Sequence, residues 1–195
     1  MANPVRGQLG RFIIKVLSWL PATFALWYFT APVLLWPVRL VAELVTRMAF
    51  ADLVHAIERN GATLTFVTTL KPGSAIAASG QVAVDVDMLV YSFGLPLFAA
   101  LVLAAREPGW LRRIVAGYAV LVPFITWGVL ADFLKNVAIT SGPFVASQTG
   151  FVAWQRETIA FAFQFGSLIL PSVAPAVVWV LTHRAFLERL RGGAA

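Results

Sequence analysis

Two carboxylates two residues apart, Asp85 and Asp87, are the first candidates for chemistry in the sequence. On a β-strand they would point to the same face, where paired carboxylates can bind a cation or divide the roles of acid and base. The same spacing also arises on the solvent-exposed face of an ordinary amphipathic strand. We therefore treat this pair as a candidate contact for a partner and not as a catalytic dyad.

A second group of four charges lies beside two long apolar stretches. Asp132 and Lys135 are three residues apart and would share one face of a helix, and Arg156 and Glu157 come just before the last apolar stretch. Such charges either form a solvated cluster at helix ends or contact a partner protein. The full set of candidate partner contacts is Asp132, Lys135, Arg156, Glu157, Asp85 and Asp87.

No pattern of residues predicts a catalytic, cofactor-binding or metal-binding site. The chain contains no cysteine, which excludes thiolate metal ligands and a cysteine nucleophile. Lys71 with Ser74, and Lys135 with Ser141, could form serine–lysine dyads, but both combinations are typical of turns. There is no glycine-rich phosphate loop between a strand and a helix. We therefore expect a protein that is not an enzyme and that binds no cofactor and no metal.

The composition is that of an integral membrane protein. Of the 195 residues, 59% are hydrophobic and 12% are charged, whereas roughly 25% are charged in soluble domains. So few charges cannot cover a water-facing surface, and so much apolar sequence excludes a disordered chain. The net charge of +6 is therefore read as membrane topology and not as nucleic-acid binding.

Four apolar stretches could cross the hydrocarbon core, which takes about 20 residues. We predict one integral membrane domain over 1–195, with spans at about 12–36, 89–105, 114–133 and 158–181. Prolines are tolerated in such spans because neighbouring helices satisfy the freed carbonyls, and Pro171 with Pro175 predicts a kink in the last span.

The distribution of basic residues predicts the orientation. Lysine and arginine are denser in both terminal segments and in the short second connection than in the two long connections. The positive-inside rule then places both termini in the cytoplasm, and segment 37–88 and loop 134–157 outside it. His55 and His183 would lie on opposite sides of the membrane, so they cannot share a metal ion within one chain.

The extracytoplasmic segment is predicted to form a cap with an amphipathic helix and a β-hairpin. Residues 37–60 have apolar side chains at roughly helical spacing, with Asn60-Gly61 as a stop signal. This helix would lie in the outer headgroup plane or pack against the rest of the cap. Residues 62–88 contain two alternating runs around a turn at 71–80, typical of a hairpin. The fold class is thus a mainly α membrane protein with four transmembrane helices and this cap.

Aromatic, proline and glycine positions along the chain resemble those of the exosortase H-associated membrane proteins of Gram-negative bacteria. The resemblance covers roughly residues 12 to 187. Its motifs are Trp19-Leu20-Pro21, Trp27-Tyr28, Trp36-Pro37, Tyr91-Ser92-Phe93-Gly94-Leu95-Pro96-Leu97, Pro123-Phe124, Trp127-Gly128 followed by Asp132 and Lys135, and Leu170-Pro171-Ser172-Val173-Ala174-Pro175.

The resemblance implies a multi-pass protein of the bacterial inner membrane that accompanies an exosortase. Exosortases process exported proteins with a short C-terminal sorting signal, and their sortase-type chemistry needs a cysteine that this chain lacks. We expect a non-catalytic accessory or scaffold subunit that binds an exosortase or its substrate proteins, besides the lipid bilayer. Its docking surface would be the cap, where free strand edges invite strand addition, together with the four charges.

The alternative function is a small oligomeric membrane transporter or channel. Transporters place polar groups near the middle of the bilayer and often contain repeated halves. In this chain the predicted spans offer little beyond Gln164 and a few hydroxyls, and no internal repeat is visible. The oligomeric state is left open by the sequence.

Overall fold

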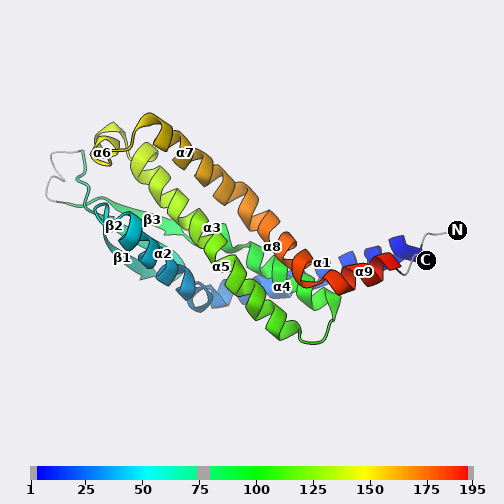
Figure 1. Cartoon of the computed structure of the whole chain (residues 1–195). Coiled ribbons are helices and arrows are strands. Elements are labelled where there is room, and N and C mark those ends of the chain that lie inside the picture. The colour runs from blue at the N-terminus through cyan, green and yellow to red at the C-terminus, as the bar shows by residue number, and fades with distance from the viewer. Residues whose placement is uncertain (1–3, 74–79, 193–195) are drawn as a thin grey trace.

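The computed structural model describes residues 4–73 and 80–192 of the chain. Long helices run side by side, and both ends of the chain lie at one end of the molecule (Figure 1). A small sheet and the short helix α6 lie at the opposite end, which we call the cap end (Figure 1). The predicted turn at 71–80 falls partly on residues 74–79, which lie outside the described residues.

Helices make up most of the described chain, with three short strands between them. In chain order the elements are α1 (Pro4–Leu34), α2 (Trp36–Ala49), β1 (Val54–Asn60), β2 (Thr63–Thr68), β3 (Ala83–Asp87), α3 (Leu89–Ser92), α4 (Gly94–Ala105), α5 (Trp110–Lys135), the π-helix η2 (Asn136–Thr140), α6 (Pro143–Gln148), α7 (Ala153–Gln164), the π-helix η3 (Phe165–Ile169), α8 (Leu170–Thr182) and α9 (Arg184–Gly192).

Three helical stretches are long and apolar enough to cross a membrane. They cover Gly7–Leu34, Trp110–Thr140 and Ala153–Thr182. The second predicted span, Leu89–Ala105, is apolar but shorter, and it divides into α3 and α4 at Phe93. Most of α4 is buried in the bundle, as expected for a helix that is apolar all round. The described helices thus include three candidate spans by length, where four are predicted from the sequence.

The region of Pro171 and Pro175 departs from regular α-helix. The π-helix η3 comes directly before α8, and Pro171, the second residue of α8, has no N–H to donate to the carbonyls of that preceding turn. Pro175 lies inside α8 and cannot donate to the carbonyl of Pro171. The last predicted span is therefore a helix with an irregular middle, as its prolines indicate.

The segment 37–60 is not one amphipathic helix, so this part of the sequence prediction is wrong. Helix α2 ends at Ala49, and Val54–Asn60 forms strand β1. Asn60-Gly61, which reads as a helix stop, lies where β1 ends: Asn60 pairs with Thr63 of β2, and Gly61 and Ala62 form the tight turn between the two strands. Gly61 has φ of +61°, the left-handed conformation that such hairpin turns require.

The predicted hairpin is confirmed but belongs to a larger sheet. β2 pairs antiparallel with both β1 and β3, so the sheet has three strands in the order β1-β2-β3. Its buried face carries Leu64, Phe66, Val84 and Val86, which is the alternation expected from the sequence. Phe66 stacks on Phe133 of α5, with ring centroids 4.4 Å apart. The extra strand and α5 supply the support that a lone hairpin needs.

Helix α2 has two apolar faces. One face buries Val38 and Ala42 against the rest of the molecule. Another exposes a stripe of large apolar side chains at intervals of four residues, namely Trp36, Leu40, Leu44 and Met48. The helix therefore packs against its own chain through one face and still presents an apolar surface outwards.

Candidate functional site

Asp132 is the centre of a polar network where α5 continues into η2. The Lys135 ammonium lies 3.0 Å from its Oδ1, so the two side chains share one helix face, as the sequence predicts. Asn136 Nδ2 donates to the same carboxylate oxygen and to the Asp132 carbonyl. The Tyr91 hydroxyl, from α3, also interacts with the carboxylate. These side chains are only partly exposed, so solvent screens their interactions less than those of surface pairs.

Close contacts between helices hold this network in place. A Cβ on Gly128 would lie 2.4 Å from the Tyr91 ring, so only glycine lets the tyrosine pack against α5. The Lys135 ammonium lies 4.0 Å from the centre of the Phe163 ring on α7, a cation–π contact. The network thus joins α3, α5 and α7 at a π-helical junction, and π-helical turns occur frequently at functional sites.

Arg156 and Glu157 lie apart from this network. Both come from the first half of α7 and line a surface hollow of about 430 Å³ beside η2 and α6. Among the described residues, no ion pair joins either of them to Asp132 or Lys135. Arg156 Nε is buried and has no hydrogen-bond partner among the residues that the structure describes. The four charges near the last two spans therefore form two separate groups at the cap end.

Asp85 and Asp87 lie on the exposed face of β3, in line with their spacing. Thr65 Oγ1 donates to Asp85 at 2.6 Å across the sheet. Asp87 accepts the backbone N–H of Leu89 at 2.9 Å, where α3 begins. Both carboxylates therefore have structural partners while remaining open to a protein in solution. Over residues 4–73 and 80–192, no three histidine or acidic side chains gather in a way that could hold a metal ion.

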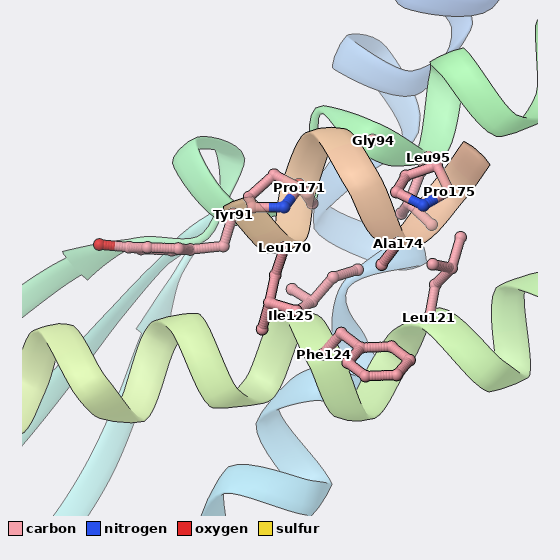
Figure 2. A pocket seen from close by; sticks show the side chains of 11 residues that line it. Tyr91, Gly94, Leu95, Leu121, Phe124, Ile125, Leu170, Pro171, Ala174 and Pro175 are labelled. Carbon is pink, nitrogen blue, oxygen red and sulfur yellow. The ribbon is translucent and has the colours of Figure 1, made fainter. Parts of the chain in front are cut away.

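Figure 2 shows a small cavity between α4, α5 and α8. Its volume of about 10 Å³ has room for about one water molecule. Tyr91 points away from the cavity, whereas the apolar side chains of α5 and α8 face each other across it (Figure 2). Ser92 Oγ, also at the wall, is buried and has no hydrogen-bond partner among the described groups. The cavity is too small for a substrate.

The opposite end of the molecule contains a polar cluster that the sequence analysis missed. Arg113 Nη1 lies 2.5 Å from buried Glu107 and also donates to the Thr182 carbonyl at 2.8 Å, so it ties α5 to the end of α8. His183 is buried beside it, with Nδ1 3.1 Å from the Trp179 carbonyl. Burial lowers the pKa of His183 below its usual value. The sequence signal that could have indicated this cluster is Glu107, an acidic residue in the basic connection between the second and third predicted spans.

The chain is similar to one family of known proteins. The sequence profile of the exosortase H-associated membrane proteins matches residues 6–186, which confirms the resemblance in the aromatic, proline and glycine positions. No curated protein and no solved structure matches the chain. The matched region includes both groups of charges near the last two spans and the whole of the sheet.

Proposed function

The chain belongs to the exosortase H-associated membrane protein family, and on that basis we propose that it is a non-catalytic accessory subunit of an exosortase system. It would hold an exosortase, or a substrate protein of that enzyme, in the bacterial inner membrane. The family match over most of the chain is the observation that supports this proposal. The charged side chains of the cap end fit a binding role, since Asp85 and Asp87 lie on the exposed face of β3 and the Asp132–Lys135 pair is partly exposed.

In the proposed topology the chain crosses the membrane four times, with α3 and α4 together as the shorter crossing. The basic residues of the terminal segments would lie in the cytoplasm, and the cap end would lie outside it. This arrangement is supported by the position of both termini at one end of the molecule (Figure 1). The burial of α4 supports it further, because a crossing surrounded by other helices meets little lipid.

We propose the cap end as the docking surface. The partly exposed Asp132–Lys135 pair and the hollow beside Arg156 and Glu157 would fix the register of a partner. Charges of this kind contribute more to specificity and orientation than to affinity. The exposed carboxylates of β3, Asp85 and Asp87, would extend the same surface across the sheet.

The test is recovery of the exosortase with the tagged protein from native membranes. Replacing Asp132 and Lys135 together by Ala should lower this recovery severalfold while insertion in the membrane is unchanged. A second variant, Asp132→Asn with Lys135→Gln, removes both charges but keeps an acceptor oxygen for Asn136 and side chains of similar size, so it should lose recovery while retaining most of the thermal stability. Unchanged recovery in the double-alanine protein would remove this pair from the docking surface. Failure of the wild-type protein to recover an exosortase would overturn the proposed function itself.

A further inference from the structure

A groove of about 400 Å³ separates helix α2 from strand β1 at the cap end. Its volume lies in the range of ligand-binding clefts, about 300–1,000 Å³. One wall is formed by α2, and the other by residues 54–57 of β1 and the preceding turn. Because the sheet order is β1-β2-β3, strand β1 is an edge strand, and its backbone is paired on one side only. Unpaired edges of this kind accept an added strand.

The backbone of β1 offers hydrogen-bonding groups to this groove. Arg39 Nη2 donates to the Ile57 carbonyl at 3.3 Å, so this carbonyl points towards α2 and away from β2. In an antiparallel ladder both polar groups of a residue point the same way, so the N–H of Ile57 faces the groove as well. Only the 3.3 Å hydrogen bond from Arg39 occupies the backbone of β1 at Ile57 on the groove side, and an extended chain could replace it there.

A bulge in β1 brings a further side chain to the groove. The register with β2 shifts between Val54 and Ala56, which leaves His55 without a partner on β2. The exposed His55 side chain lines the groove. Bulges commonly redirect a side chain next to functional sites, and this one places an imidazole opposite α2.

The charges of the groove favour an acidic occupant. On α2, Arg39 pairs with Glu43 at 2.6 Å, so these two charges largely cancel. Arg47, one turn further on, is exposed and forms no ion pair within the described residues. The remaining charge on the groove wall is therefore positive. Charge complementarity predicts that a segment with carboxylate side chains fits it better than a basic or purely apolar one.

We infer that this groove binds an extended acidic segment of a partner protein as a fourth strand alongside β1, with Arg47 opposite a carboxylate of that segment. The main chain of the segment would pair with β1 and supply affinity, and its alternate side chains would supply specificity. The inference rests on the proposed function, because it adds a binding site for a segment of the partner, beside β1, to the docking surface of the cap end.

The probe for the test is a fluorescent hexapeptide of alternating Val and Glu, added to the purified full-length protein in detergent. Fluorescence anisotropy should report binding that is weakened about threefold to fivefold by Arg47→Gln, as expected for one partly exposed ion pair. Arg112→Gln makes the same change at the opposite end of the molecule and should leave binding unchanged. Melting temperatures of both variants show whether each is folded.

Two further arms separate strand addition from attraction between charges alone. A hexapeptide methylated on alternate backbone nitrogens keeps its charge but loses the hydrogen bonds of a strand, so it should not bind. Since the chain has no cysteine, His55→Cys supplies a single thiol for disulfide capture of a cysteine-bearing hexapeptide. Ala83→Cys places the thiol on the other edge strand, β3, and should capture far less.

The groove is the wrong site if the methylated peptide binds as well as the unmodified one, or if Arg47→Gln has no effect. Equal capture by Ala83→Cys, or a protein–protein disulfide as the main His55→Cys product, would also overturn the inference. Peptide binding by the purified protein is independent of exosortase recovery. If exosortase is recovered but the peptide does not bind, the inference alone fails. If the peptide binds through Arg47 but no exosortase is recovered, the proposed function alone fails.

Discussion

One carboxylate, that of Asp132 on α5, is linked to η2, to α3 and, through Lys135, to α7. It accepts from Asn136, pairs with Lys135 at 3.0 Å and meets the Tyr91 hydroxyl, while Lys135 reaches the Phe163 ring. Removing the carboxylate therefore leaves a partly buried lysine without its anion, which is destabilising. Any binding experiment at this residue therefore needs a variant that removes both charges together and keeps the acceptor for Asn136, and Asp132→Asn with Lys135→Gln provides it.

At the same scale, His183 should make the stability of the protein depend on pH. Burial, reinforced by nearby Arg113, lowers the pKa of its imidazole below the usual 6.5, against the opposing effects of the Trp179 carbonyl and Glu107. The unfolded chain then takes up a proton before the folded one does. The contribution of His183 to the free energy of unfolding is therefore lost as the pH falls through 6.5 towards the lowered pKa.

His183→Phe should reduce this pH dependence, because the phenyl ring can stack on Trp179 but cannot be protonated. We expect the melting temperature of the wild-type protein to fall more between pH 7.5 and pH 5.5 than that of the variant. Thermal unfolding followed by tryptophan fluorescence measures both. An equal fall in the two proteins would show that His183 does not titrate in this window.

At the scale of elements, the crossing of α5 and η3 depends on two glycines. A Cβ on Gly128 would lie 3.2 Å from the Gly166 carbonyl as well as against Tyr91, so both neighbours would have to move. Small residues allow this close approach of helices in membrane proteins. The π-helical turn η3 thus packs against α5 at Gly128, about one helical turn before Asp132.

Gly128→Ala should therefore destabilise the protein by about 1–3 kcal/mol, the usual cost of overpacking. The free energy of unfolding in mixed detergent micelles measures this effect. Gly10→Ala is the matched control, since Gly10 is also within a helix but a Cβ there meets no atom within 4 Å. The control should be unchanged or slightly more stable, because alanine favours helix. A Gly128→Ala protein as stable as Gly10→Ala would contradict the close crossing.

At the scale of the whole molecule, the number of membrane crossings decides the position of the ends. Three crossings would leave the termini on opposite sides of the membrane, whereas four would return them to the same side. The three long helices alone would give the odd number, and the proposed crossing by the short α3–α4 pair would make it even. Both termini lie at one end of the molecule, as four crossings require (Figure 1).

Reporter fusions after Gly73 and after Arg191 should distinguish these topologies. A phosphatase that is active only outside the cytoplasm should be active after Gly73 and inactive after Arg191. A fluorescent protein that matures only in the cytoplasm should give the opposite pattern at the two positions. Phosphatase activity after Arg191 would show that the α3–α4 pair does not cross, and the proposed topology would fall.

Local periodicity and composition in the sequence were sufficient for several features. They indicated the membrane class, the long apolar helices, the alternation of the strands β2 and β3, and the shared helix face of Asp132 and Lys135. Each of these depends on residues a few positions apart, or on the average over a stretch. The physical cause therefore lies within the segment itself, where a single sequence can reveal it.

Features that depend on distant partners were decided only by the tertiary structure. Residues 54–60 fit a helical as well as a strand period, and hydrogen bonds to β2 decide in favour of the strand. Arg156 comes just before the last predicted span, yet it lines a separate hollow beside η2 and α6 and forms no ion pair with Asp132 among the described residues. The groove likewise exists only because a helix, α2, and a strand, β1, lie side by side in the folded chain. Such contacts carry no local signature, because their energy comes from surfaces that the folded chain alone brings together.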